Sequence, residues 1–419
     1  MKCGLVISDE SGRIFSHSEL EAAGMEAGNF FELDPADLIR LPPGSRLFNL
    51  PHRIPVGLDL WKKIVRLDGY SAVAAFLPPG YTVTHNSAYK ESAGHKILPL
   101  YSYAACALQD GKIYAAAVRV DRDRRHDQRF IDMRLVKKNT VAFKKIFRKN
   151  RLIPHLARCA LVYGCPNAQN FFLSRREAPL PTSPRCNSRC AGCISYQPAP
   201  EICPSQPRID FIPTPSEISE IALYHIENVK YPIVSFGQGC EGEPLMAADV
   251  IGEAIRMIRQ RTGRGIINMN TNASKPAMLM RLFDAGLDSI RVSMNSVRPV
   301  YYKRYYRPAG YAYSDVTRSI RIAKSKGRFV SLNYLTMPGF TDLKDEVAAL
   351  KRFVREYRVD MLQWRNLNYD PLLYFKKLKI RVSPSELVGV RATIESIRKE
   401  CPNIRMGYFN PREAASRHR

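Results

Sequence analysis

From about residue 179 onward, short apolar runs alternate with amphipathic segments, and this alternation restricts the fold more than any other feature of the sequence. Apolar runs at 233–236, 265–270, 289–294, 329–335 and 361–365 predict strands. Segments beginning Thr214-Pro-Ser-Glu217 and Ser383-Pro-Ser-Glu386 have the residues of a capping box with proline at the first helical position, so they predict helix starts. Gly286 and Gly327 stand where left-handed helix ends are expected.

Strands that alternate with helices form right-handed βα units around a parallel sheet. With one more strand just before Cys186, the chain has about six such units, too few to close an eight-stranded barrel. The sequence therefore predicts an α/β fold, a partial (βα)6 TIM-like barrel, over residues 179–410.

The first 150 residues predict a separate mixed, β-rich domain. Apolar segments at 104–108 and 112–118 flank Asp110-Gly111, a pair suited to the positive φ angles of a two-residue hairpin turn. Proline- and glycine-rich stretches punctuate this region as loops. Residues 151–178 are interpreted as a basic, cysteine-containing connector to the barrel.

Three of the ten cysteines form a cluster, Cys186-x-x-x-Cys190-x-x-Cys193, after the first predicted barrel strand. Thiolates at this spacing can surround a compact iron–sulfur core. A cube of four irons takes four ligands, so three cysteines leave one iron open, as catalytic metal centres require. The remaining alternative is zinc held with a distant fourth ligand. Cys159, Cys165, Cys203 and Cys240 lack a regular spacing, and whether they hold an auxiliary cluster is left open.

This CxxxCxxC run in a βα chain resembles the radical S-adenosylmethionine (radical SAM) superfamily. Gly242-Glu243-Pro244, after the second strand, is similar to the GEP segment of that superfamily, which receives the methionine amino group. The core looks closest to the subgroup with molybdopterin-biosynthesis, peptide-maturing and enzyme-activating members. The resemblance implies a 4Fe-4S cluster on Cys186, Cys190 and Cys193. It also implies S-adenosylmethionine on the open iron and an external flavodoxin- or ferredoxin-like electron donor.

Later strands add further candidate cofactor residues. The turn after the third strand, Thr271-Asn272-Ala273, resembles the TNG-like turn of the superfamily, with alanine in place of glycine. Ser293 and Asn295 fall in a stretch similar to the one that holds ribose and the methionine carboxylate, although Asn295 replaces an acid. Arg365, at the end of the sixth strand, is the preferred anion-binding residue, and a structural ion pair is its alternative role. No catalytic side chain is assigned.

Two segments depart from a simple pattern. The family has an aromatic residue just before the third cysteine, and here that position is Gly192, so Tyr196 or a sixth-strand side chain is expected to steady the nucleotide. The segment 301–307 interleaves tyrosines with lysine and arginine. It fits a stacking surface for bases or a tyrosine-rich protein interface equally well.

The chain is strongly basic, with 64 Lys and Arg against 39 Asp and Glu and a formal net charge of +25. Between Arg122 and Arg158, thirteen basic residues accompany only three acidic ones. Such a block attracts anions, including nucleic acid. It also fits the solvated face of a helix, because Phe143, Ile146 and Phe147 recur at helical spacing.

The function that these features imply is reductive cleavage of S-adenosylmethionine to a 5'-deoxyadenosyl radical that abstracts hydrogen from a substrate. That substrate is a protein or peptide, an RNA or a phosphorylated small molecule. The alternative is a non-catalytic, metal-stapled module that binds nucleic acid. No stretch approaches the ~18 apolar residues of a membrane helix, and the N-terminus does not resemble a secretory signal, so we expect a cytoplasmic protein without a membrane span.

Overall fold

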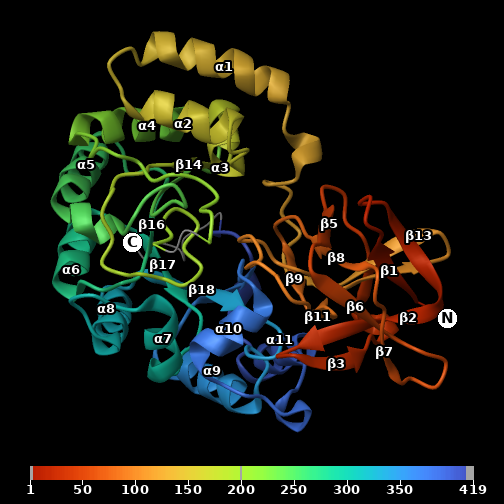
Figure 1. Ribbon diagram of the computed structural model, residues 1–419. Helices are drawn as coiled ribbons and strands as arrows, with labels where there is room; N and C mark the ends of the chain where they lie inside the picture. Colours follow the sequence, from red (N-terminus) through yellow and green to blue (C-terminus); the bar gives the residue numbers. More distant parts are fainter. Residues whose placement is uncertain (1–2, 199–200, 412–419) are drawn as a thin grey trace.

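The computed structural model describes residues 3–198 and 201–411, and they form two lobes that lie side by side (Figure 1). The red and orange lobe at the N-terminus is a β structure, and the larger lobe carries the helices. Residues 1 and 2 of the predicted N-terminal domain and residues 199 and 200 of the predicted barrel domain lie outside the described residues.

The larger lobe is built on a seven-stranded sheet whose strand order follows the chain. Every neighbouring pair in it is parallel. Its strands are β14 (Glu177–Pro179), β15 (Ile233–Phe236), β16 (Ile266–Thr271), β17 (Ser289–Met294), β18 (Phe329–Thr336), β19 (Met361–Asn366) and β20 (Arg405–Gly407). The predicted partial barrel is confirmed, and the short strand β20 extends it by one strand that the sequence analysis did not find.

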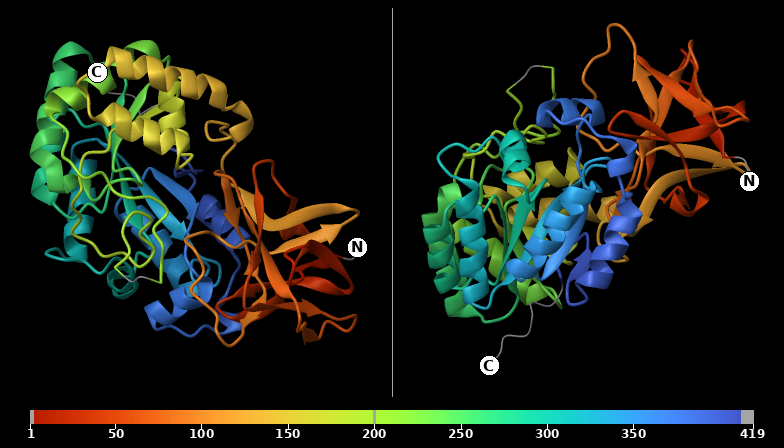
Figure 2. Two further views of the ribbon diagram at one scale, coloured as in Figure 1. Left: turned by 45° about the horizontal axis from the view of Figure 1, so that its top comes forward. Right: turned by 90° about the horizontal axis from the view of Figure 1, so that it is seen from below.

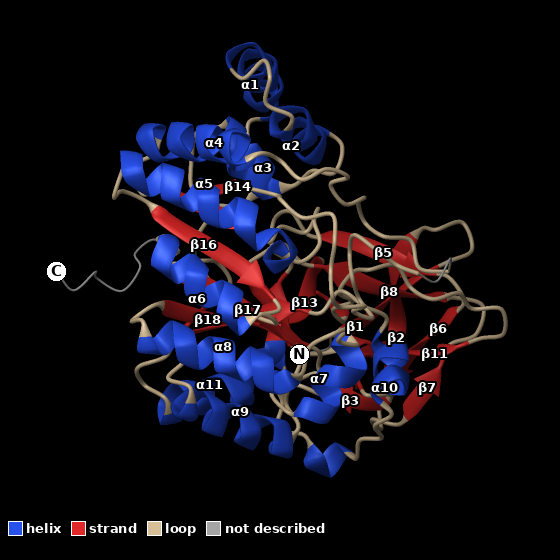
Figure 3. Cartoon of the chain, turned by 90° about the vertical axis from the view of Figure 1, so that its left-hand side faces the viewer, coloured by secondary structure: helices blue, strands red, loops and turns tan. Residues whose placement is uncertain are grey.

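Helices cover the outer face of this sheet, as the side view in Figure 3 shows. They are α4 (Pro215–Asn228), α5 (Ala248–Arg261), α6 (Pro276–Ala285), α7 (Pro299–Tyr306), α8 (Tyr313–Ser325), α9 (Lys344–Glu356), α10 (Pro371–Leu378) and α11 (Val390–Glu400). Their apolar faces and the strands share one hydrophobic core. Strands buried on both faces are rich in apolar residues, which is why the sequence revealed them.

The capping signals were right at one predicted helix start and wrong at the other. Thr214 and Glu217 form the reciprocal capping box of α4, with the Thr214 amide donating to the Glu217 carboxylate over 2.7 Å. Gly286 ends α6 in the left-handed conformation, as predicted. At 383–386, by contrast, only a single 3-10 turn forms. The chain then runs extended, since the Val388 amide donates to the Asp342 carbonyl, and helix α11 begins only after Gly389.

The N-terminal lobe contains β1 to β13, joined in one sheet system of antiparallel pairs. The strands are β1 (Gly4–Ser8), β2 (Ile14–Glu26), β3 (Asn29–Glu32), β4 (Leu38–Arg40), β5 (Arg46–Leu50), β6 (Arg53–Leu58), β7 (Ile64–Arg66), β8 (Ser71–Phe76), β9 (Tyr81–Val83), β10 (Asn86–Ser87), β11 (Tyr89–Glu91), β12 (Cys106–Gln109) and β13 (Lys112–Arg119). The predicted hairpin joins β12 to β13, and both Asp110 and Gly111 have positive φ angles.

Three helices connect the lobes: α1 (Met133–Ile146), α2 (Leu152–Leu161) and α3 (Pro166–Phe172). They cap the barrel beside α4, at the top of Figure 1 and in the left view of Figure 2. Phe143 of α1 packs against Tyr224 of α4, with ring centroids 5.1 Å apart. The predicted apolar stripe of this basic segment is only partly buried, because Phe143 and Phe147 are inside while Ile146 is exposed.

Buried contacts fasten the N-terminal lobe to the barrel. Arg53 and Asp370 form an ion pair over 3.2 Å in which both side chains are buried. The Thr82 hydroxyl donates to the Trp364 carbonyl of β19 over 2.8 Å. Within the described ranges, no helix combines the length and the apolar character that crossing a bilayer requires.

Candidate active site

The three clustered cysteines line one cavity of about 850 Å³ at the carboxyl ends of the barrel strands. All three are free thiols that are partly buried. Backbone bonds to α7 hold the loop that carries them: the amides of Arg189 and Ala191 donate to the carbonyls of Tyr306 and Tyr305. The structure thus brings together the cysteines that the sequence singled out.

The glycine of the GEP segment lies against the backbone of the cysteine loop. The Gly242 amide donates to the Ser183 carbonyl over 2.6 Å, and the Glu243 amide donates to the Arg185 carbonyl over 2.8 Å. A Cβ atom on residue 242 would lie 2.1 Å from the Arg185 carbonyl oxygen, which no side chain can tolerate. Glycine is therefore required for the two motifs to pair.

Glu243 presents a buried carboxylate to the same cavity. It accepts hydrogen bonds from the Thr271 hydroxyl and from the amides of Asn272, over 2.8 Å, and Leu245, over 3.2 Å. Burial nevertheless raises the pKa of Glu243 to about 7, because these donors offset only part of the desolvation. A cation bound beside Glu243 would offset the rest of the desolvation cost of its charged carboxylate. Pro244, the third residue of the motif, is buried at the start of a 3-10 turn.

The neighbouring carboxylate, Glu241, was missed by the sequence analysis. One of its oxygens accepts from the amides of Gly237 and Gln238, each over 2.7 Å. The other oxygen accepts from Thr182 and Ser183, over 2.8 and 3.0 Å. Glu241 therefore joins the loop after β15 to the cysteine loop. Nothing in the sequence distinguishes it from any other glutamate beside a motif.

Asn272 connects the third strand to the cysteine loop. Its side-chain amide donates to Asn187 Oδ1 over 2.8 Å and to Ser188 Oγ over 3.0 Å, while its backbone amide donates to the Glu243 carboxylate. The following residue, Ala273, has a φ of 55°. This left-handed conformation is the one that glycine adopts without strain, so the structure accounts for the glycine of the TNG-like turn.

The two candidates on β17 are placed differently. Ser293 lines the cavity. Asn295 is fully buried outside it, where its side-chain amide donates to the Tyr374 hydroxyl over 3.1 Å. The structure therefore does not bring Asn295 to the other predicted cofactor residues. Its ribose role had rested only on its position in the motif.

Two arginines lie together in the cavity, Arg365 of β19 and Arg291 of β17. Burial, and then the positive charge of Arg365, lower the pKa of Arg291 to about 9. Arg365 donates to the Tyr408 carbonyl over 3.1 Å and covers the Tyr408 ring. Among the described residues, Asn333 Oδ1 nearby is buried without a hydrogen-bond partner. Arg291 was missed by the sequence analysis, because only the register of the parallel strands brings it to Arg365.

Tyrosines of α7 occupy the space next to Gly192. A Cβ atom on residue 192 would lie 2.9 Å from the Tyr305 hydroxyl and 3.3 Å from the Tyr369 ring. Tyr305 and Tyr306 line the cavity, whereas Tyr196 is half exposed beneath Arg208. The sequence analysis offered segment 301–307 as a stacking surface for bases or as a protein interface. Tyr302, Tyr305 and Tyr306 are buried in the core, so these three tyrosines do not form an exposed protein interface. The segment instead supplies aromatic surface to the cavity.

The other cysteines do not gather as a set of four. Cys203 is exposed and donates to the adjacent Pro204 carbonyl. Cys159 and Cys240 lie together with His155, outside the set of residues that line the main cavity. Of the described residues, His155, Cys159 and Cys240 are therefore the candidates for an auxiliary metal site.

The side chains fit the cofactors that the resemblance implies. Burial, and then the charge of Glu243, raise the pKa of Cys186 to about 11, so iron would provide the positive charge that a thiolate needs. The Arg208 guanidinium donates to Cys193 Sγ over 3.4 Å and would stabilise an anionic cluster. Glu243 can accept an ammonium group from the cavity side.

Comparisons with known proteins agree with this geometry. Residues 180–354 match the model of the Radical SAM superfamily. The chain is 30% identical over 185 residues to the GTP 3',8-cyclase of Lactiplantibacillus plantarum, covering 43% of this chain and 51% of that protein. It is 27% identical over 205 residues to molybdenum cofactor biosynthesis protein 1 of Bos taurus, covering 46% of this chain and 30% of that one.

A solved structure of a maturase of the FeFe-hydrogenase is similar at 16% identity, with a TM-score of 0.40 and coverage of 66% of each chain. The chain spans about half or less of the length of the curated relatives that it matches. Residues 180–354 nevertheless form a radical SAM domain, and the members of the radical SAM superfamily are enzymes that use a 4Fe-4S cluster and S-adenosylmethionine.

Proposed function

We propose that Cys186, Cys190 and Cys193 ligate the cluster and that Glu243 receives the ammonium group of S-adenosylmethionine. The observation that carries this assignment is that the three thiols and the buried carboxylate line one cavity, with their loops joined by backbone hydrogen bonds. Gly242, Pro244 and Asn272 hold the backbone around Glu243. Ser293 of β17 lines the same cavity and would face the nucleotide.

When bound, a reduced cluster would supply one electron for the cleavage of S-adenosylmethionine to methionine and a 5'-deoxyadenosyl radical, which would abstract hydrogen from the substrate. The protein positions the reactants and excludes water from the cavity. Tyr305 and Tyr306 line the cavity close to Gly192, and their rings would form the wall against the adenine. The electron comes from an external donor of the flavodoxin or ferredoxin kind.

The substrate is an anion that Arg291 and Arg365 bind. Arg291 and Arg365 line one cavity in which the carboxylate that acts on Arg291 is the single charge of Glu177. Paired arginines suit phosphate or carboxylate groups. The relative from Lactiplantibacillus plantarum is named for a nucleoside triphosphate, which carries such groups. We therefore favour a phosphorylated substrate among the classes left open by the sequence.

The N-terminal lobe forms part of the wall of this cavity through Arg46, Phe76, Pro78 and Tyr101. We assign residues 1–150 to a domain that covers and selects the substrate. Residues 151–178 connect it to the catalytic domain, residues 179–410. The alternative of a non-catalytic nucleic-acid module loses its basis, because the domain is that of an enzyme.

Anaerobic reconstitution of the full chain with iron and sulfide tests the cofactor site. We expect absorption near ~410 nm, and 5'-deoxyadenosine after addition of reductant and S-adenosylmethionine. Cys190→Ala should abolish both signals. Glu243→Gln should keep the absorption and lose most of the cleavage, since it removes only the charge that holds the ammonium group. Glu253→Gln, on the exposed face of α5, serves as the control.

Full cleavage by Glu243→Gln would contradict the placement of S-adenosylmethionine. The anion site is tested separately, by calorimetric titration of the reconstituted protein with inorganic pyrophosphate. Arg365→Gln should weaken binding about tenfold or more, as expected for a hydrogen bond to a charged group. Arg134→Gln should leave the affinity for pyrophosphate unchanged, because Arg134 is almost fully exposed on α1. Equal affinity of both variants would exclude a phosphate site at Arg365.

A further inference from the structure

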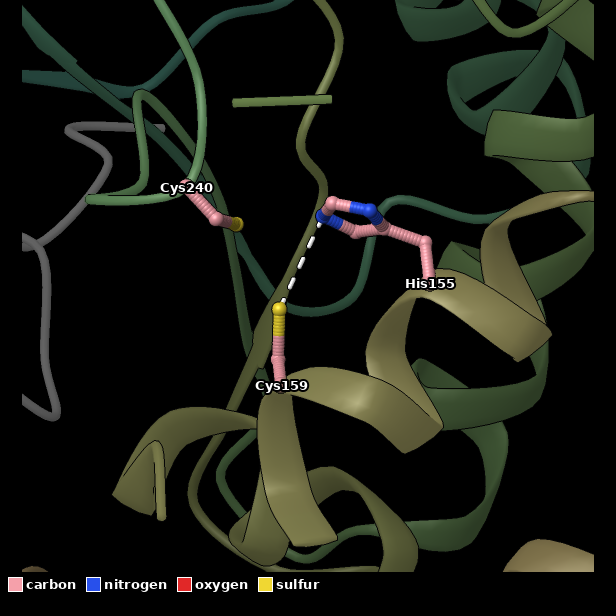
Figure 4. A group of neighbouring side chains, drawn as sticks. All are labelled: His155, Cys159 and Cys240. Atoms are coloured by element: carbon pink, nitrogen blue, oxygen red, sulfur yellow. Dashed lines mark hydrogen bonds between the residues drawn. The ribbon is translucent and has the colours of Figure 1, made fainter. Parts of the chain in front are cut away.

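A second group of metal-ligating side chains lies outside the cavity of the cluster cysteines. His155 and Cys159 are four residues apart on α2 and therefore lie on one face of that helix. Cys240 reaches them from the loop after β15, some eighty residues later in the chain. Figure 4 shows the three side chains directed toward one another.

The ligand atoms of this group have the spacing of a mononuclear site. The imidazole nitrogen and the two sulfurs all lie within 4.8 Å of one another. Cys159 Sγ lies 3.6 Å from His155 Nε2. In a tetrahedral zinc site, the bond lengths place nitrogen and sulfur about 3.6 Å apart and two sulfurs about 3.8 Å apart. The group needs little movement to reach these values.

The ligand atoms of the cluster cysteines have a different spacing. Within the described residues, Cys186, Cys190 and Cys193 are not gathered within that limit. Each thiolate of a cubic cluster binds its own iron, so its ligands stand farther apart than those of a single ion. The two groups of thiols therefore suit different metals.

We propose that His155, Cys159 and Cys240 form a structural zinc site. Zinc takes imidazole and thiolate ligands, and the residues here are of these two kinds, with no carboxylate among them. The two cysteines are almost fully buried, and His155 is partly buried, so the ion would be largely shielded from solvent. Cys165 lies beside the group, since its backbone amide donates to the Cys159 carbonyl over 2.9 Å, and its thiol would move closer to complete the four protein ligands of a closed site.

Such a site would brace the loop that builds the cofactor pocket. Cys240 directly precedes Glu241 and stands three residues before Glu243. Its carbonyl accepts from the Ile209 amide over 2.8 Å, so the loop is already fixed on the side of residues 201–214. Zinc would fix it to α2 as well. The role is independent of the substrate and of the radical reaction.

The experiment uses the full chain with Cys186, Cys190 and Cys193 all changed to alanine, so that the primary cluster cannot form. We expect metal analysis of this protein to find about one zinc per chain, as for a closed structural site. Adding Cys159→Ser and Cys240→Ser should remove it. Adding Cys203→Ser instead, which changes an exposed cysteine, should leave zinc in place.

Three results would overturn the proposal. One is metal-free protein in which mass spectrometry finds a disulfide between Cys159 and Cys240. Another is iron with acid-labile sulfide in the triple-alanine protein, which would indicate a second cluster. The third is retention of zinc after loss of both cysteines.

If the serine variants do not fold, His155→Gln provides the test, because that side chain is partly exposed. The triple-alanine protein should melt at a lower temperature in excess chelator. With His155→Gln added, it should lose zinc at a lower chelator concentration. Melting that is unaffected by the chelator in the triple-alanine protein would also overturn the proposal.

Discussion

Ala273 occupies a backbone conformation that suits glycine, at a φ of 55°. Alanine pays about 1–2 kcal/mol there, which exceeds the roughly 0.8 kcal/mol gained by burying its methyl group. We expect Ala273→Gly to raise the free energy of unfolding slightly, by up to about 1 kcal/mol. Ala392→Gly, at an exposed position inside α11, should lower it by about 1 kcal/mol. Urea unfolding of the apoproteins measures the free energy of unfolding of both variants. An equal decrease in the two variants would contradict backbone strain at Ala273.

Gly242 is the residue at which the two motifs meet. Gly242→Ala would drive a methyl group against the Arg185 carbonyl, so the GEP loop and the cysteine loop must separate. We expect reconstituted protein to lose most of its iron and its S-adenosylmethionine cleavage together. Gly252→Ala, within α5 and with no atom nearer than 3.5 Å to the added Cβ, should keep both. Normal iron content in Gly242→Ala would show that the loops can move apart.

Residues that act through a local motif could be predicted, and residues that act through tertiary register could not. Cys186, Cys190 and Cys193 were singled out by their spacing, and Glu243 by the resemblance of its tripeptide to the GEP segment. Arg291 reaches Arg365 only through the alignment of β17, β18 and β19. Tyr305 reaches Gly192 only because α7 folds back onto the cysteine loop. No local pattern in the sequence records these contacts.

Among the elements, the loop between β15 and α5 is the one that organises the site. Glu241 stabilises it by accepting four backbone amides with its two oxygens. Glu241→Gln replaces one oxygen with a donor that faces two amides, and each lost hydrogen bond to a buried charge costs about 1.5–3 kcal/mol. We expect a clear loss of thermal stability and of reconstituted iron, unlike in Glu253→Gln. Unchanged melting would show that the loop does not depend on this carboxylate.

The elements themselves were predictable where one physical cause dominates. Burial on both faces makes β15 to β19 rich in apolar residues, so all five were located within a residue or two. Strand β20 has only three residues, so its sequence is too short to predict a strand. Ser383–Glu386 has a capping sequence, but tertiary contacts prevent a helix from starting there. The Val388 amide donates to the Asp342 carbonyl, so the chain is extended at that point and not helical. A cap signals a helix only if the following residues are free to form one.

At the scale of the whole molecule, the two lobes act as one body around the cavity. Arg53 and Asp370 are both buried at their contact, and the Leu98 amide also donates to Asp370 over 3.1 Å. Tyr81 and Val83 of β9 bond to the Asn366 side chain. These contacts keep the N-terminal wall of the cavity at a fixed position relative to the cluster cysteines.

The same contact region contains a pair of buried acids, Glu26 of the N-terminal lobe and Asp342 of the loop after β18. Burial raises the pKa of both, and the Asp342 carboxylate raises that of Glu26 further. The His85 ring lies 3.2 Å from Glu26, but burial lowers the pKa of His85, so it provides little positive charge at neutral pH. The folded protein therefore keeps a proton on Glu26 where the unfolded chain has lost it.

Because the folded state binds that extra proton, its stability is complete below the ordinary glutamate pKa and falls as the pH rises toward the folded pKa. The slope is up to about 1.4 kcal/mol per pH unit. Glu26→Gln keeps a neutral group at this position, so we expect it to unfold at a higher temperature than the wild type at pH 8 and at a similar temperature at pH 4. Glu253→Gln should follow the wild type throughout. Thermal unfolding across this range makes the comparison, and parallel curves for Glu26→Gln and the wild type would mean that the two lobes do not share a buried proton.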